Sequence, residues 1–454
     1  MKVRGLLFSA TVGAAALVTH LPSARAEGLY SVSREVSNVF KTDLAPAFSR
    51  YVDADLDMPW GLIQAHDPCY LFTSLACHAG APPLHGGATQ GAQVEARKLL
   101  WAANHDSRVI TVYNDLGVAP TNGGQALTIT VAGAPTGLVY NAGCEPTLQA
   151  TWSGVRYTTS CDVVSTTPTH NFDVGAGGAF APSFVMAAAR DGKIYGWNPG
   201  IDVENAQVVR DDSATGADYL GLAQDPSGSA VYLADFHNGR VVAYDRSWNP
   251  VSFVGREGVA HPWLEDSSIP QGFAPSNLAF VNGRLIVTYG KQGPAGAAYE
   301  AVGPSFPGAF YSGPHGYAVA FTLHADGTYE IKHLDVPDRA LDAPWGIVVA
   351  PAGFGEAGPR LCLGNFGDGY INVFDAVTLD YGGRLGDLPG AGSTVASQVR
   401  LPGLRGLQIK PMRSQGGVGA GGFLVDRLFY NANLNYRAGA GADAWSVFGF
   451  IAAN

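Results

Sequence analysis

The sequence predicts an all-β fold, and within that class a six-bladed β-propeller whose last blade is closed by an N-terminal strand. Helical periodicity is nearly absent. Instead, short runs rich in Val, Ile, Tyr and Phe alternate with turns of Gly, Asn and Asp. One unit, a short strand followed by a hairpin, recurs along the chain, and such self-similarity is typical of repeat architectures. Two packed β-sandwiches are the alternative, but they do not account for six matching openings.

The first element of each unit is a strand that carries a small residue before an aliphatic one. Small residues are expected at the crowded centre of a propeller, where bulky side chains collide. The six openings are Pro59-Trp60-Gly61-Leu62, Pro135-Thr136-Gly137-Leu138, Leu220-Gly221-Leu222, Pro275-Ser276-Asn277-Leu278, Pro344-Trp345-Gly346-Ile347 and Leu404-Arg405-Gly406-Leu407.

A hairpin of two apolar strands follows each opening. Four hairpins are contiguous, and three of their tips hold Asp-Gly or Asn-Gly, the dipeptides that favour a positive φ. They read LWAANHDSRVITVYN from Leu100, FVMAAARDGKIYGWN from Phe184, VYLADFHNGRVVAYD from Val231 and LCLGNFGDGYINVFD from Leu361. An insertion splits the fourth hairpin, between Arg284 and Phe321, and the sixth unit runs from Phe423 to Ile451.

Outer strands complete five of the units. They are expected at Ala126 to Val131, Ala206 to Arg210, Val251 to Val254, Tyr329 to Leu334 and Leu379 to Leu385. The last unit lacks such a strand, so Tyr30 to Val39 is expected to supply it and to remove an exposed sheet edge.

The first 26 residues have the pattern of a secretory signal. Lys2 and Arg4 precede the apolar stretch from Leu6 to Val18, and Ala24 to Ala26 offers small residues for cleavage. A single propeller domain is therefore expected over residues 27–454, with insertions at about 64–97, 143–182 and 290–316. Secretion or periplasmic location follows as an expectation.

The five cysteines suit an oxidising compartment. Cys69 with Cys77 and Cys144 with Cys161 are the expected disulfides, although four cysteines allow three connectivities. Cys362 lies in an apolar run and is expected to be a buried thiol rather than a reactive one.

Composition excludes several classes of protein. The chain is 46% apolar, which is too much to remain disordered. Its net charge of −10 argues against a non-specific nucleic-acid binder. No apolar run outside the N-terminus reaches about 18 residues, so no mature membrane span is expected. We expect a monomer.

The quoted hairpins, with PWGL, APTGLVYNAG and APWGIVVAPAGFG, follow one order that resembles an uncharacterised family of secreted bacterial propellers. Some members of that family carry a C-terminal PEP-CTERM sorting tail, whereas this chain ends in VFGFIAAN. More distantly, the hairpins look like NHL repeats and the six-bladed SMP-30, gluconolactonase and paraoxonase group. The resemblance implies the fold more than an activity.

Hairpin tips and blade entrances share one face of a propeller, which there surrounds an axial mouth. The polar side chains expected on this face, as ligand-binding candidates, are Asn104, Asp106, Asp191, Asp235, Asn238 and Asp368, with Arg190, Asn431 and Asn433 beside them. The insertions at 64–97 and 143–182 and both disulfides belong on the opposite face.

Three interpretations of these tip residues remain open. Asp and Asn side chains stabilise turns by bonding their own backbone. Alternatively, Asn104, Asp235 and Asn365 hold a metal such as Ca²⁺, as in six-bladed hydrolases, although Trp60 and Trp345 stand where a lactonase-like site has a glutamate. In the third interpretation His105 or His237 is a general base.

No complete catalytic set emerges from the sequence. Trp60 and Trp345 either form an aromatic lip for a sugar or planar ligand, or pack between blades. The leading expectation is an exported propeller that binds a small molecule, carbohydrate-like ligand or surface component at its axial mouth. The alternative is a metal-dependent hydrolase of the lactonase or phosphoesterase type.

Overall fold

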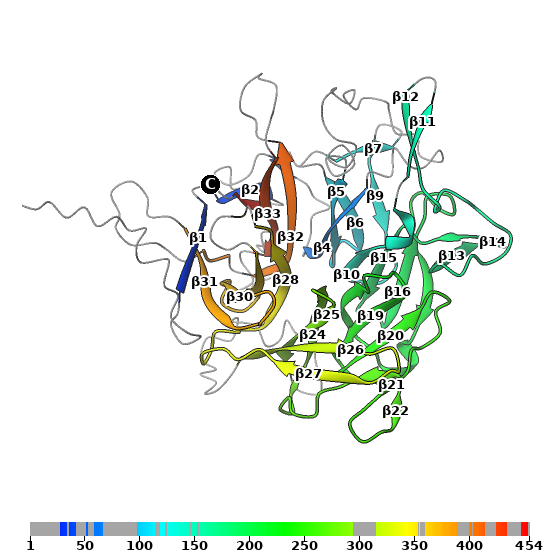
Figure 1. Ribbon diagram of the computed structural model, residues 1–454. Helices are drawn as coiled ribbons and strands as arrows, with labels where there is room; N and C mark the ends of the chain where they lie inside the picture. Colours follow the sequence, from blue (N-terminus) through cyan, green and yellow to red (C-terminus); the bar gives the residue numbers. More distant parts are fainter. Residues whose placement is uncertain are drawn as a thin grey trace, which may run out of the picture.

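The computed structural model shows an all-β chain whose sheets are arranged around a common centre (Figure 1). The described part contains strands and two short 3₁₀ turns. The residues that the structure describes are 28–33, 36–41, 51–52, 59–66, 98–113, 119–122, 125–145, 147–151, 154–293, 315–352, 354, 359–387, 399–401, 403–413, 424–433 and 446–452.

The first three large sheets follow chain order, each from its inner to its outer strand. The first sheet is β4 (Pro59–His66), β5 (Lys98–Asn104), β6 (Val109–Tyr113) and β9 (Thr128–Thr130). The second is β10 (Pro135–Tyr140), β15 (Val185–Ala189), β16 (Lys193–Trp197) and β17 (Gln207–Asp211). The third is β18 (Tyr219–Gln224), β19 (Ala230–Asp235), β20 (Arg240–Asp245) and β23 (Trp263–Leu264).

The remaining large sheets continue the same order. The next sheet is β24 (Phe273–Val281), β25 (Arg284–Lys291), β26 (Gly316–Leu323) and β27 (Tyr329–His333). It is followed by β28 (Pro344–Ala350), β29 (Arg360–Asn365), β30 (Ile371–Asp375), β31 (Tyr381–Asp387) and β1 (Gly28–Ser33). The last is β32 (Leu404–Arg413), β33 (Leu424–Asn433), β34 (Ser446–Ala452), β2 (Val36–Lys41) and β3 (Tyr51–Val52).

The innermost strands form a closed ring. Each of β4, β10, β18, β24, β28 and β32 contacts the next, and β32 contacts β4. Figure 1 shows β4, β10, β24, β28 and β32 gathered at the centre, with the outer strands toward the rim. This is a β-propeller arrangement, so that part of the expectation is confirmed.

Glycines in the openings allow the innermost strands to come this close. A Cβ added at Gly61 would lie 2.6 Å from the carbonyl oxygen of Thr136 in the neighbouring strand. A Cβ at Gly406 would lie 2.6 Å from Cβ of Leu62, across the point where β32 meets β4. The small residues of the repeat are therefore required by backbone contact between sheets.

Apolar side chains fill the wedges between neighbouring sheets. Trp101 of the first sheet packs with Phe184 and Trp197 of the second, and all three are buried. Its ring centroid lies 5.8 Å from that of Trp197. Strands with both faces covered explain why the hairpins are nearly continuous apolar runs.

The N-terminal segment closes the last sheet, in two pieces rather than one. The expected strand at Tyr30 to Val39 is divided into β1 and β2. β2 pairs antiparallel with β34, and Val36 lies opposite Ile451. β1 pairs parallel with β31 of the preceding sheet. β2 thus closes the last sheet as predicted, whereas β1 pairs with the outer strand of the preceding sheet.

One outer strand was misplaced in the sequence prediction. Val251 to Val254 was expected to complete the third sheet, but β21 (Phe253–Val254) pairs with β22 (Ala260–His261) in a separate two-stranded sheet. The outer position is taken by β23. Both segments are short and apolar, so periodicity alone does not choose between them.

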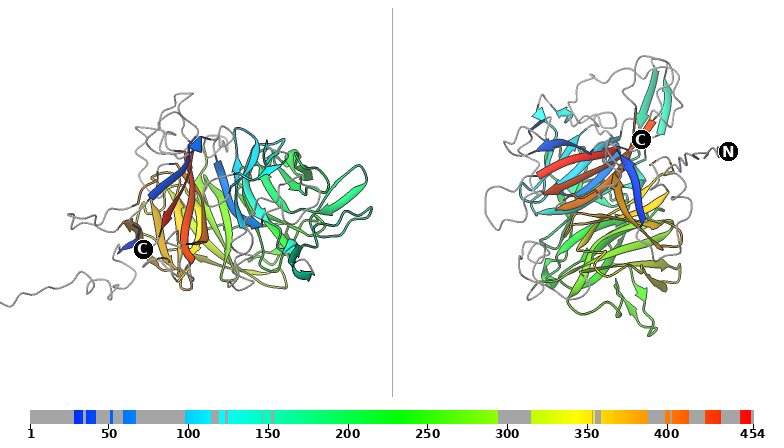
Figure 2. Two further views of the ribbon diagram at one scale, coloured as in Figure 1. Left: turned by 90° about the horizontal axis from the view of Figure 1, so that it is seen from above. Right: turned by 90° about the vertical axis from the view of Figure 1, so that its left-hand side faces the viewer.

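The insertion at 143–182 lies between β10 and β15, at the end of the second sheet opposite its hairpin tip, because Tyr140 pairs with Val185 and Pro135 with Ala189. It contains the hairpins β11 (Thr147–Thr151) with β12 (Gly154–Thr158), and β13 (Asp173–Ala176) with β14 (Ala179–Pro182). The β11–β12 hairpin projects away from the large sheets (Figures 1 and 2).

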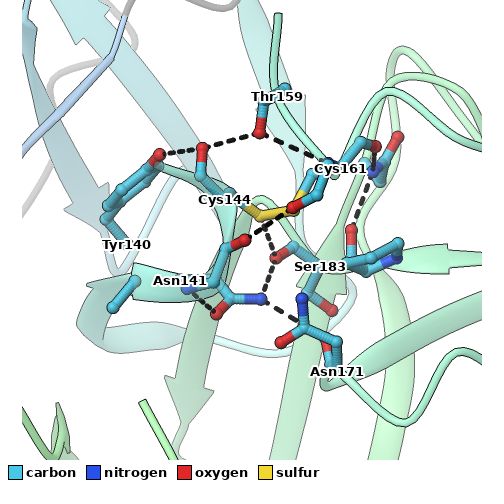
Figure 3. Close-up of a disulfide and its surroundings, with 12 residues drawn as sticks. Tyr140, Asn141, Cys144, Thr159, Cys161, Asn171 and Ser183 are labelled. Atoms are coloured by element: carbon cyan, nitrogen blue, oxygen red, sulfur yellow. Dashed lines mark hydrogen bonds between the residues drawn. A yellow bond between two sulfur atoms is a disulfide. The ribbon is translucent and has the colours of Figure 1, made fainter. Parts of the chain in front are cut away.

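A disulfide fastens the base of this insertion. Cys144 and Cys161 are joined, as predicted, with their Cα atoms 5.2 Å apart (Figure 3). Thr159 Oγ1 and the Tyr140 hydroxyl both donate to the carbonyl of Cys144, at 2.6 Å each. The predicted Cys69–Cys77 pair and most of the 64–97 and 290–316 insertions lie outside the described residues.

Cys362 is a free, fully buried thiol, as expected. Burial raises its pKa to about 12, so the thiol stays protonated at neutral pH. In the described part of the chain, no helix is long and apolar enough to cross a membrane.

Candidate functional site

The three predicted metal ligands, Asn104, Asp235 and Asn365, stand at equivalent positions, at the end of the second strand of their sheets. All three are buried. Asn104 Nδ2 donates to Thr111 Oγ1 at 2.9 Å within its own hairpin. Asn365 Nδ2 donates to the Ala340 carbonyl at 2.8 Å, at the entrance of its own sheet. The contacts of both amides favour the turn-stabilising interpretation.

Asp235 is held in the same way. It accepts a 2.8 Å hydrogen bond from Asn238 Nδ2, and Arg240 Nε lies 3.4 Å away in the same hairpin. Burial raises the pKa of Asp235 despite these donors. Among the described residues, no group of three His, Cys, Asp or Glu side chains is placed to hold a metal ion.

The remaining tip residues also have hydrogen-bond partners, either in their own hairpin or in the neighbouring sheet. Asp191 accepts from the Tyr195 hydroxyl at 2.7 Å. Asp368 Oδ1 accepts from Asn365 Nδ2 at 2.9 Å, and burial raises its pKa. The carbonyl of His237 accepts from Gln292 Nε2 at 3.2 Å. The contacts of Asp191 and Asp368 thus lie within their own hairpins.

Asn431 has a different role from the one expected. Its Oδ1 accepts from the backbone N–H of Gly406 at 2.6 Å, and its Nδ2 donates to the carbonyl of Gly61 at 3.3 Å. It thus bridges the last sheet and the first. The side chain of Asn433 lies outside the described residues.

His105 and Arg190 are the predicted residues that do reach the centre. The His105 ring stacks on Trp60 with centroids 5.0 Å apart. Its Nδ1 lies 2.5 Å from Asp106 Oδ1, and this hydrogen bond lowers the pKa of Asp106. Arg190 forms a bidentate pair with Asp218, and its guanidinium lies 5.7 Å from the Trp60 centroid.

At this face the axis is filled by side chains. Each opening contributes the residue that precedes its glycine or asparagine. These residues, here called the axial plug, are Trp60, Thr136, Leu220, Ser276, Trp345 and Arg405, and each is at most 1% exposed. Phe236 and Phe366, the first residues after β19 and β29, pack against them. The expected axial mouth is closed on the hairpin side, and the aromatic lip is a packed core.

Arg405 sits within the aromatic part of the plug. Its guanidinium carbon lies 3.6 Å from the Trp60 centroid and 4.3 Å from that of Phe366. The ring of Trp60 meets Trp345 edge-on at 5.0 Å. Cation–π contacts of a desolvated guanidinium are each worth about 2 kcal/mol or more, so the plug is held electrostatically as well as by burial.

Below the plug the axis is hollow. A cavity of about 390 Å³ is bounded by all of the innermost strands, from Trp60 and Trp345 at one end to Pro226, in the β18–β19 loop, at the other. Along these strands the first residues are buried, and residues nearer the far end, such as Ile63, Val139 and Gln408, are half-exposed. The cavity therefore opens on the face opposite the hairpin tips.

The wall of this cavity combines mostly aliphatic side chains with polar surface that is nearly as large. The described lining residues include no ionisable side chain. The aliphatic and aromatic residues beyond the plug are Leu62, Ile63, Leu138, Val139, Leu222, Leu278, Phe280, Ile347 and Leu407. Such a volume and lining suit a small uncharged molecule.

This cavity was not predictable from the sequence. Trp60 and Trp345 were singled out as residues of the openings, but Arg405 was not recognised as their partner. Aligning the residue before each glycine supplies the missing signal, because these positions meet at the axis. The hollow depends on how far the closed ring holds its strands apart, which no single repeat encodes.

In sequence, the chain is similar to uncharacterized proteins of Acanthamoeba polyphaga mimivirus. It is 31% identical to protein R640 over 207 residues, which are 45% of this chain and 35% of that protein. It is 26% identical to protein L690 over 209 residues, covering 45% of this chain and 50% of that one. The chain thus spans between about a third and a half of the length of these relatives. No family model matches the chain.

Among solved structures, the chain is similar to the Dos1 propeller, with a TM-score of 0.33 and 10% identity, over 82% of this chain and 69% of that one. It is also similar to a chain of a nidogen/laminin complex, with a TM-score of 0.31 and 11% identity, over 65% and 84% of the two chains.

Proposed function

We propose that this protein is a binding propeller that holds a small, uncharged and mainly apolar molecule in its axial cavity. The observation that carries the proposal is the hollow of about 390 Å³, closed at one end by the axial plug. The lining side chains are uncharged and mostly aliphatic, which favours an uncharged ligand with an apolar body.

We further propose that the ring has six blades. The count is supported by the six innermost strands that contact one another in succession. It is supported as well by the four- and five-stranded sheets, each of which begins with one of those strands.

Binding is tested with N-phenyl-1-naphthylamine, an uncharged apolar fluorophore, titrated into the full chain. Gln408 lines the half-exposed part of the cavity, so Gln408→Trp is expected to fill it and to weaken binding at least tenfold, which is about 1.4 kcal/mol. Gln125→Trp, on exposed β8 (Gln125–Ala126), is the control and should bind as the wild type does. Equal binding by all three proteins, or none, would contradict the proposal.

Export is proposed from the signal-like first 26 residues and from the resemblance to secreted propellers. Expression of the whole chain in a secreting bacterial host should yield an extracytoplasmic protein that begins at Glu27. N-terminal sequencing of the product checks this, and an uncleaved cytoplasmic chain would contradict it.

A further inference from the structure

We infer that Asn277 determines which ligands the axial cavity selects: molecules with an apolar body and a hydroxyl or N–H group that donates to the side-chain oxygen of Asn277. The inference rests on the proposed binding function and adds the chemical group that orients the ligand.

Asn277 interrupts the glycine pattern of the innermost strands. It follows the plug residue Ser276 in β24, at the position where the other five strands have glycine. It is half-buried and lines the cavity. The layer directly below the plug therefore carries one carboxamide, at the closed end of the cavity. The glycines of this layer are Gly61, Gly137, Gly221, Gly346 and Gly406.

Two contacts place this carboxamide. Asn277 Nδ2 donates to the carbonyl of Trp345 in β28 at 2.8 Å. Because a carbonyl only accepts, this bond fixes which end of the carboxamide is the NH2 group and leaves Oδ1 at the other end. A Cβ added at Gly221 of β18 would lie 2.5 Å from Oδ1. The carboxamide thus contacts both adjacent innermost strands, whereas the outer side of β24 is covered by β25.

Asn277 Oδ1 has the capacity to accept a hydrogen bond from a ligand. It accepts none from the part of the chain that the structure describes. It does not belong to the fully buried polar atoms that lack a partner, so it keeps accessible surface. With β18 and β28 on either side, β25 behind and the plug above, that surface faces the cavity. An apolar ligand that covered this oxygen without donating to it would lose free energy.

The other two amide side chains of the wall are less suited to orient a ligand. Gln224 Oε1 accepts from the N–H of Ala142 at 2.7 Å, and its Nε2 donates to Asn141 Oδ1 at 3.2 Å, so both ends are bonded. Gln408 lies nearer the open end, where water competes for its oxygen. Asn277 is therefore the amide acceptor at the closed end.

The test compares 2-naphthol with 2-methylnaphthalene, which have nearly the same shape, by displacement of N-phenyl-1-naphthylamine from the full chain at pH 7. Asn277→Gly introduces the residue of the other five openings and removes the acceptor. It should lower the affinity for 2-naphthol relative to 2-methylnaphthalene by about three- to tenfold, the value of one hydrogen bond. 2-Methoxynaphthalene, which has the oxygen but no donor, should behave as the hydrocarbon does.

Asn282→Gly is the matched control. Asn282 lies in the turn between β24 and β25, and its Nδ2 also donates to a carbonyl of the next sheet, that of Ala376, at 2.9 Å. It does not line the cavity, and its φ of 49° suits glycine. This variant loses the same kind of hydrogen bond between sheets and should keep the affinity ratio of the wild type.

The outcomes separate the two proposals. The wild type should bind 2-naphthol at least as tightly as 2-methylnaphthalene, because Asn277 compensates the desolvated hydroxyl. A wild type that prefers the hydrocarbon would overturn the inference and leave cavity binding in place, even if Asn277→Gly failed to fold. An unchanged ratio in Asn277→Gly, or an equal loss for 2-methoxynaphthalene, would overturn it as well. Binding of none of the probes to the wild type would overturn the proposed function together with the inference.

Discussion

At the scale of single residues, burial changes the ionisation of one carboxyl group beside the plug. Asp342, at the entrance of β28, has a carboxyl pKa raised to about 6 by burial and by the nearby charge of Asp368. His315 Nδ1, 3.4 Å from its Oδ1, offsets only part of this effect. Folding therefore favours the protonated form of Asp342.

We therefore predict that Asp342→Asn raises the free energy of unfolding by an amount that depends on pH. The folded pKa lies above the ordinary 3.8, so the favourable contribution of the proton is fully present below about pH 4 and is lost as pH rises through 6. The variant should gain about 1–2 kcal/mol of unfolding free energy at pH 8 and little at pH 4. Urea unfolding of the variant and the wild type at pH 4 and pH 8 measures this gain.

Asp326→Asn is the control for that prediction. Asp326 lies in a turn, and hydrogen bonds from Thr328 lower its pKa, so its substitution should stabilise the protein at neither pH. An equal gain at pH 4 and pH 8 in Asp342→Asn would show that the charge of Asp342 is not the cause.

At the scale of elements, two features each depend on one specific pairing: the disulfide-bound insertion and the β2–β34 ladder. Cys144 and Cys161 are 17 residues apart, so the disulfide restricts a short loop of the unfolded chain. β2 lies between β34 and β3, whereas β1 lies at the edge of its sheet.

Removal of the disulfide should destabilise the chain. A double Cys144→Ser, Cys161→Ser variant is expected to lose about 3 kcal/mol, the chain-entropy value for a loop of this size. Urea unfolding measures the loss. Reductant should lower the stability of the wild type by at least this amount, and a response that remains in the variant would come from the expected Cys69–Cys77 pair. A double variant as stable as the wild type would contradict the prediction.

Proline substitutions should separate the roles of β1 and β2. Asn38→Pro breaks the β2 ladder at its pairing with Gly449, and we expect a loss of about 2 kcal/mol or more. Ser31→Pro, on the edge strand β1, should cost clearly less. Urea midpoints of the two variants give the comparison, and equal losses would mean that β2 is not the closing strand.

The strands themselves were largely predictable, since apolar runs and glycine turns are local signals. Gly192, Gly239 and Gly369 adopt the positive φ expected of their hairpin tips. The division of Tyr30 to Val39 into two strands was not predictable, because the choice between β31 and β34 as partner depends on how neighbouring sheets lie. The tip residues lie at the expected hairpins, but the partners of their side chains, within the hairpin for Asp191 and across to the first sheet for Asn431, are a tertiary property.

At the scale of the whole molecule, the ring is closed by backbone contact and by one asparagine. Gly406 abuts Leu62, and Asn431 bonds both Gly406 and the carbonyl of Gly61. This junction joins the last sheet to the first. A steric clash at this point would therefore displace the innermost strands and alter the cavity that they enclose.

Gly406→Ala is expected to destabilise the protein by about 1–3 kcal/mol, the usual cost of overpacking, because its Cβ would lie 2.6 Å from Cβ of Leu62. Gly178→Asn, in a turn with no atom within 4 Å of the added Cβ and with a φ of 84° that Asn tolerates, should be nearly neutral. Thermal unfolding compares the stabilities of the two variants. A Gly406→Ala variant as stable as the wild type would contradict close packing between the last sheet and the first.

The pairing of Val36 with Ile451 also bears on biosynthesis. While the ribosome is still extending the chain, β2 has no partner until β34 emerges, after the strands of all the other large sheets. Nascent chains therefore carry an unsatisfied strand throughout the synthesis of those sheets, which is a hazard for aggregation. Chaperones that keep such segments apart should matter more for the yield of this protein than for one whose sheets form from consecutive strands.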